Sequence, residues 1–155
     1  MTKNPRPIRR SFQPHHPGVD YGVLDELLGY EVRRAQIRVT EAFDARLGAL
    51  GVTTQRFSAL VLIAANPGLK QTELAAIMGI ARSGALAIVE GLGDLIARQP
   101  IPGDARAQAL ALSAAGQARL PAIIAEVRAH DREAAGDLTP DEIATLKALL
   151  ARVAP

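Results

Sequence analysis

Apolar residues recur in steps of three and four along most of the chain, which is the spacing of one buried face of an α-helix. Over residues 20–50 this pattern predicts one long helix, and Gly51 suits the left-handed position that ends it. A second helix is expected from about Thr53, a suitable N-cap, to the Asn66-Pro67-Gly68 turn. The first third of the chain is therefore expected to be helical.

Two shorter amphipathic segments follow at 71–78 and 82–92, and a turn containing Gly79 separates them. Two short helices joined by such a turn favour a helix-turn-helix. On the second segment the periodicity leaves two buried faces open, because it allows burial of Leu86 and Val89 or of Ala85 and Ile88.

Residues 95–98 and 108–112 flank the Pro- and Gly-containing stretch Gln99-Pro100-Ile101-Pro102-Gly103-Asp104. Short apolar runs on either side of such a stretch predict a two-stranded hairpin with a rigid loop. A hairpin directly after a helix-turn-helix is a candidate wing.

Two further helices are expected towards the C-terminus. Ser113 can cap a helix that reaches about Ala135, and Thr139-Pro140-Asp141-Glu142 combines an N-cap, a first-turn proline and a capping-box glutamate. The apolar faces of the first and last helices exceed what a winged domain of about 65 residues can cover, so a homodimer is predicted. The residues expected to form the buried face of the last helix are Ile143, Leu146, Leu149, Leu150 and Val153.

The composition fits a single helical domain. The chain has 155 residues, 48% of them hydrophobic but only 3% aromatic, so its core has to be built from aliphatic side chains. The sequence contains no cysteine, which excludes disulfides and thiolate chemistry. We find no membrane-spanning run and no signal-peptide core, and we expect a cytoplasmic protein without a membrane partner.

The positive charge is concentrated at the N-terminus. The first 17 residues carry +4, and the remaining residues carry −2 of the net +2. With four prolines and no acid, residues 1–18 are predicted to form a flexible basic arm, followed by a single domain at 19–155. An anionic partner would have to meet this arm or local patches of the body.

The sequence offers no support for catalysis. His15 and His16 are adjacent and His130 is distant, so no spacing typical of a metal site exists. The Gly91-Leu92-Gly93 stretch does not follow a strand and is not a dinucleotide loop. We expect neither an enzyme nor a bound cofactor or metal.

Residues 53–120 resemble the MarR family of winged helix-turn-helix regulators. The resemblance is carried by QTELAAIMGI at 71–80, by Asp104-Ala105-Arg106 in the wing, and by Leu112-Ser113-Ala114-Ala115-Gly116 after it. It implies a mainly α fold with a small β-hairpin wing, in which 51–116 form the winged helix-turn-helix. The helices at 19–50 and 117–155 would then provide dimerisation.

The resemblance also implies a dimeric regulator that binds double-stranded DNA. Arg106 at the wing tip could enter a minor groove and Asp104 could orient it by a charge-assisted hydrogen bond, while Arg98 on the first strand is placed for a phosphate. The presumed recognition helix is poor in donors, since Gly84, Ala87 and Glu90 stand at outward positions. The remaining DNA-binding candidates are Lys70, Gln71, Arg82 and Ser83.

Many regulators of this family release DNA when they bind an aromatic acid or a related metabolite, so the resemblance implies a ligand-responsive repressor. The candidate effector-binding residues are three cations and two aromatic side chains, namely Arg34, Arg38, Arg56, Tyr21 and Phe57. The alternative for these arginines is solvation, or pairing with Glu31, Glu41 and Asp44. The alternative for the whole protein is a winged-helix interaction module with weak or lost DNA binding.

Overall fold

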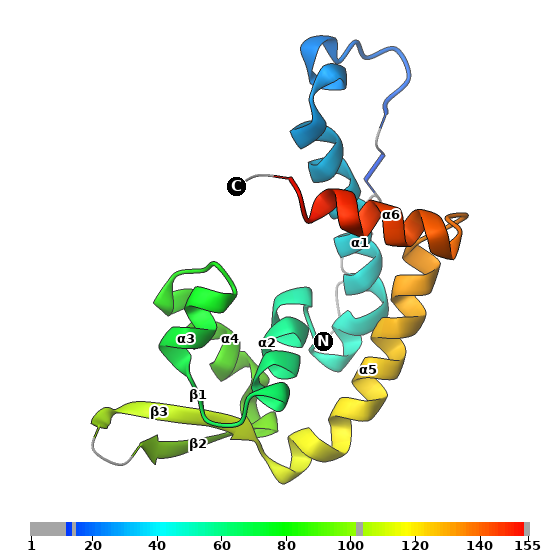
Figure 1. The fold of residues 1–155 in the computed structure, drawn as a ribbon. Helices are drawn as coiled ribbons and strands as arrows, with labels where there is room; N and C mark the ends of the chain where they lie inside the picture. Colours follow the sequence, from blue (N-terminus) through cyan, green and yellow to red (C-terminus); the bar gives the residue numbers. More distant parts are fainter. Residues whose placement is uncertain (1–11, 14, 102–103, 154–155) are drawn as a thin grey trace, which may run out of the picture.

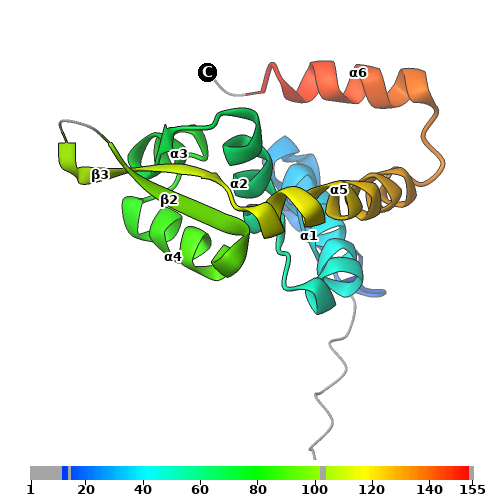
Figure 2. The same ribbon diagram turned by 90° about the horizontal axis from the view of Figure 1, so that it is seen from below.

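The computed structural model describes residues 12–13, 15–101 and 104–153, with the side chains of 104–107 left outside the description. In this part of the chain, six α-helices accompany one three-stranded sheet (Figure 1). The helix-turn-helix and the hairpin lie at one end of the molecule, and α1, α5 and α6 lie at the other (Figures 1 and 2). This arrangement confirms the predicted mainly α winged helix-turn-helix fold.

No single helix of the described residues is long and apolar enough to cross a membrane. Two bent helix pairs, 28–50 with 54–65 and 71–77 with 82–95, reach the length and hydrophobicity of a membrane span only when the two helices of each pair are taken together.

The first helical region is divided where one continuous helix was expected. A 3-10 helix η1 (Gly22–Glu26) precedes α1 (Leu28–Leu47), and a second 3-10 turn η2 (Gly48–Leu50) follows it. Asp20 accepts a hydrogen bond from the Gly22 N–H at 2.8 Å, and Gly22 has φ +52°, which starts a tight turn rather than an α-helix. The predicted end is confirmed, because Gly51 has φ +71°.

The basic arm predicted at 1–18 lies mostly outside the described residues. Where it is described, it is attached to α1: the Phe12 N–H donates to the Glu41 carboxylate at 2.7 Å. The division of the chain into arm and domain stays a prediction.

The next three helices lie where the sequence placed them, within one residue. They are α2 (Thr54–Ala65), α3 (Gln71–Ile77) and α4 (Arg82–Leu92), the last continuing into the 3-10 turn η3 (Gly93–Leu95). Thr53 caps α2 by accepting a hydrogen bond from the Arg56 N–H at 3.2 Å.

The sheet has one strand more than predicted. The hairpin strands are β2 (Ile96–Ile101) and β3 (Asp104–Leu112), both longer than expected, and the short β1 (Leu69–Lys70) pairs with the other edge of β3. Leu110 of the central strand β3 pairs with Leu69 of β1 on one side and with Arg98 of β2 on the other. A two-residue strand carries no detectable alternation in the sequence, so only the pairing with β3 identifies it.

The C-terminal helices begin at the predicted caps. Ser113 caps α5 (Ala114–Ala134), and Thr139 caps α6 (Pro140–Leu150) in a capping box with Glu142. The Thr139 N–H and hydroxyl both donate to the Glu142 carboxylate and lower its pKa below the ordinary value.

Arg46 joins α5 to α1. It donates to Glu133 at 2.6 Å and to Glu126 at 3.0 Å. The hydrogen bond from Arg46 lowers the pKa of Glu133 and raises that of the guanidinium. These contacts fix α5 beside α1 on the far side of the molecule from the wing.

One aliphatic core joins the C-terminal half of α1 to the winged helix-turn-helix and to α5. Its largest fully buried apolar side chains come from α1, the α1–α2 connection, α2, α3 and β3: Leu47, Val52, Leu60, Ile63, Leu74 and Leu110. The orientation of the winged helix-turn-helix is therefore set by the same packing that holds α1.

The prediction of a buried face on α6 is wrong for the single chain. Leu149 remains 52% exposed, and Leu146, Leu150 and Val153 are similarly exposed. Figure 2 shows the cause, since α6 runs apart from the α1–α5 pair to which it is joined. Its apolar face is present as predicted but, apart from the half-buried Ile143, has no cover among the described residues.

Candidate DNA-binding surface

The helix-turn-helix is formed by α3 and α4, and a close backbone contact sets the angle between them. Gly79 adopts φ +64°, and the Ile80 N–H then donates to the Ala75 carbonyl at 3.0 Å. Ala75 and Ala85 are buried, so small side chains lie where the two helices meet. This reversal leaves one whole face of α4 directed outward.

The outward face of α4 consists of Arg82, Ser83, Leu86, Ala87 and Glu90, all of them exposed. The opposite face is buried and consists of Ala85, Ile88, Val89 and Leu92. Of the two buried faces that the sequence left open, the structure buries Ala85 and Ile88 of one together with Val89 of the other, and it exposes Leu86. Leu86 was therefore missed as a candidate functional residue, because helical periodicity alone offered it equally as a core residue.

The predicted DNA-binding residues lie on the helix-turn-helix and on the three strands of the sheet. Arg82 and Ser83 begin α4, Arg98 is exposed on β2, and Lys70 and Gln71 lie half-buried where β1 meets α3. Asp104 and Arg106 belong to β3 next to the hairpin tip, but their side chains lie outside the described part. The backbone thus brings all seven to the end of the molecule that carries α4 and the wing, and their roles stay predictions.

The segment after the wing holds the wing against the helices. Ser113 donates from its hydroxyl to the Asp94 carbonyl at 2.5 Å and from its N–H to the Leu95 carbonyl at 3.0 Å. The Ser113 hydroxyl also caps α5 by accepting from the Gly116 N–H at 3.0 Å. A Cβ at Gly116 would lie only 2.2 Å from the Leu95 carbonyl oxygen, so this position has no room for a side chain.

Arg56 lies against the C-terminal part of α4. Its guanidinium donates to the Gly51 carbonyl at 2.8 Å, and a Cβ added at Gly91 would lie 2.3 Å from one of its nitrogens. Arg56 thus joins the end of the η2 turn to the recognition helix. This role could not be read from the sequence, because Gly91 lies 35 residues after Arg56 along the chain.

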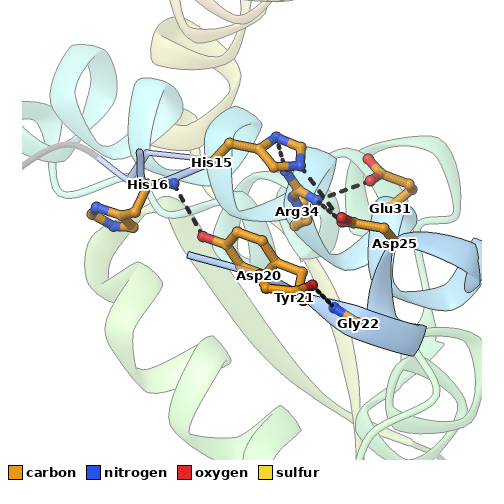
Figure 3. A network of polar contacts seen from close by, with 8 residues as sticks. All are labelled: His15, His16, Asp20, Tyr21, Gly22, Asp25, Glu31 and Arg34. Carbon is orange, nitrogen blue, oxygen red and sulfur yellow. Dashed lines mark hydrogen bonds and ion pairs between the residues drawn. The ribbon is translucent and has the colours of Figure 1, made fainter. Parts of the chain in front are cut away.

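Two of the five predicted effector-binding residues lie in one network (Figure 3). Arg34 is only 2% exposed, lies 5.6 Å from the Tyr21 ring centre, and pairs with Glu31 at 3.0 Å and Asp25 at 3.4 Å. The His15 ring completes the network, with its Nε2 3.0 Å from the guanidinium. The pairing with Glu31 matches the alternative considered for this arginine.

The other three effector candidates lie apart from that network. Arg38 is exposed on α1, Arg56 contacts Gly91, and the Phe57 ring lies 6.4 Å from the ring of Phe43 at the edge of the core. The structure therefore does not gather the five residues into one pocket, and an effector-binding role for them stays a prediction.

Comparison with known proteins gives consistent relatives, although no protein-family model matches the chain. A protein of Thauera aromatica named as a transcriptional regulatory protein for the hcr operon is 33% identical, over 86% of this chain and 82% of its own length. The transcriptional repressor CouR, bound to a 23-mer DNA duplex, is 36% identical with a TM-score of 0.82, covering 88% of this chain and 99% of that one.

CouR has also been solved with p-coumaroyl-CoA, and in that form it is 34% identical with a TM-score of 0.79, over 87% of this chain and 97% of CouR. A mutant of MarR from E. coli in complex with operator DNA has a TM-score of 0.78 at 24% identity, over 88% of this chain and all of that one. The similarity to MarR concerns the fold alone.

Proposed function

The chain belongs to the MarR family of winged helix-turn-helix transcriptional regulators, and from this premise we propose that it is a dimeric, ligand-responsive repressor that binds duplex DNA through α4 and the wing. The observation that carries the proposal is the similarity to DNA-bound CouR over 88% of this chain and 99% of CouR. The role is regulation rather than catalysis. A cytoplasmic location accords with it.

The uncovered apolar face of α6 supports a homodimer. An isolated helix of 11 residues is marginal in water, and none of the residues of this one is fully buried against the described part of its own chain. Further exposed apolar side chains, including Leu24, Leu27 and Leu28, lie at the start of the first helical region. A second copy would cover these surfaces and present two winged ends to the duplex.

The central test of DNA binding is the Arg106→Ala variant. A guanidinium near the hairpin tip is expected to enter a minor groove, where the negative potential is concentrated. Its loss should weaken binding by about 1–3 kcal/mol per contact, measured by fluorescence anisotropy with a duplex selected from a random library. Arg128→Ala, which removes an exposed cation from α5, is the matched control and should bind as the wild type does. Equal losses in the two variants would contradict a specific role of the wing.

The second candidate function is a winged-helix interaction module, and the composition of α4 favours it. The exposed face of that helix carries one cation, Arg82, and one anion, Glu90. The phosphate contribution to binding is largest at low salt, so a DNA-binding protein must retain some duplex there. Failure of every duplex to bind at low salt would establish the module instead.

We propose that the effector is an aromatic acid presented as its CoA thioester, the class of ligand bound by CouR. Adding p-coumaroyl-CoA to the protein–DNA complex should release the duplex, whereas CoA alone and free p-coumarate should not. The measurement is a titration followed by anisotropy of the labelled duplex. Release by the free acid at the same concentration would instead assign the effector to the simple aryl carboxylates.

A further inference from the structure

The exposed face of α4 is apolar at its centre. Leu86 is 40% exposed and Ala87 lies beside it, with Arg82 and Ser83 in the turn before them. A single exposed leucine on a protein surface needs no explanation. This one stands in the middle of the face that the family places in the major groove, where hydrogen-bonding side chains normally read base edges.

The remainder of that face offers little for hydrogen bonding to bases. Gly91 lies beneath the Arg56 guanidinium, which already donates to the Gly51 carbonyl. Glu90 carries a carboxylate, which can only accept hydrogen bonds and which repels phosphates. The donors are therefore restricted to Arg82 and Ser83 at the N-terminal end, and the surface between them and Glu90 consists of hydrocarbon.

Only one group on the major-groove edge of a base pair matches a hydrocarbon surface. That group is the C5-methyl of thymine, which contacts alanine and other apolar side chains. Cytosine presents only the smaller C5–H at this position, and the remaining groups are hydrogen-bond donors or acceptors. Placing Leu86 against a donor or acceptor would remove water from that group without replacing its hydrogen bond. The apolar centre of α4 thus favours thymine and disfavours the other bases.

We infer that Leu86 and Ala87 are specificity-determining residues that read thymine methyl groups in the major groove of the operator. The inference rests on the proposed DNA-binding function and adds to it the chemical class of the base contact. It predicts an operator whose half-sites carry thymines opposite α4, recognised by apolar contact.

The test replaces thymine with deoxyuridine, which removes the methyl group and keeps every hydrogen-bonding group of the base. A 30-bp duplex selected from a random library with the wild-type protein is synthesised in both forms and as a scrambled thymine control, and affinities are measured by anisotropy. The uracil form should bind about fourfold more weakly for each contacted methyl, from the usual contribution of one buried carbon. Two half-sites with one such contact each would give a loss of about 15-fold.

Variants of α4 test whether this helix causes the difference in affinity between the thymine and uracil duplexes. The Leu86→Ala variant and the Leu86→Ala/Ala87→Gly double variant should lose much of the difference between the two duplexes, as a double-mutant cycle requires. Because Leu86 is exposed, Leu86→Ala keeps the fold, and thermal denaturation verifies this. Leu50→Ala, which shortens an exposed leucine on η2, is the control and should retain the full difference.

Each outcome decides between specific statements. If the uracil and thymine duplexes bind equally and the scrambled duplex binds more weakly, the inference fails while the proposed function stands. If the difference persists undiminished in the double variant, the methyl effect comes from DNA shape, and the inference fails. If no duplex, the scrambled control included, binds at low salt, the proposed function itself fails.

Discussion

Replacing Gly116 with alanine is expected to destabilise the protein by about 3 kcal/mol or more, at the upper end of what overpacking usually costs. The added Cβ would stand 2.2 Å from the Leu95 carbonyl oxygen, a backbone atom that cannot rotate away. Leu95 is also the acceptor for the Ser113 N–H, so relieving the clash would break the contact that fixes the wing to α5. Urea denaturation at a fixed protein concentration measures the change.

The control for this variant is Gly91→Ala, the same substitution at the other glycine whose added Cβ meets a close neighbour. There the neighbour is the far end of the flexible Arg56 side chain, which can move, and alanine raises helix propensity by about 1 kcal/mol. We expect the stability of Gly91→Ala to stay within about 1 kcal/mol of the wild type. If the two variants lose stability equally, the close approach of Gly116 to the Leu95 carbonyl is not the reason that alanine destabilises the protein there.

The Leu149→Asp/Leu150→Asp double variant is expected to dissociate the dimer and to weaken operator binding by about 100-fold or more, because a monomer loses the effective concentration that links two half-sites. Both leucines are exposed in the single chain and are proposed to be covered by the partner. Burying two carboxylates in an apolar interface is strongly unfavourable. Analytical ultracentrifugation gives the mass, and anisotropy gives the affinity.

The matched control is Ala144→Asp/Ala148→Asp, which adds the same charge to the same helix. At 100° per residue these alanines lie on the side of α6 opposite Leu146, Leu149 and Leu150, and both are exposed. The control should remain dimeric and bind as the wild type does. A dimer that survives the leucine substitutions but not the alanine substitutions would place the interface on the other face of α6.

Local signals in the sequence predicted the helix boundaries well. Thr53, Ser113 and Thr139 each accept the N-terminal hydrogen bond expected of a cap, and Gly51 takes the expected left-handed conformation. These features depend on residues within three or four positions of one another, so the sequence contains the whole interaction. The same holds for the turn at Gly79, which marks the helix-turn-helix.

Local periodicity was insufficient to predict the features that depend on contacts between segments distant along the chain. The short strand β1 exists only as a partner of β3. The arginines predicted as a single effector-binding set are separated by the fold, with Arg34 in the Tyr21 network and Arg56 at Gly91. No spacing along the chain reports distances of this kind.

The sequence by itself determined which segments are helices, where every α-helix after the first begins, and that α6 has an apolar face. It also determined that the wing follows the recognition helix, because turn and cap chemistry act over a few residues. Only the tertiary structure decided which face of α4 turns outward, exposing Leu86 and burying Ala85. It also decided that the described part of one chain leaves most of the apolar face of α6 exposed. Burial depends on the surfaces that a helix meets, and those surfaces come from distant segments or from a second molecule.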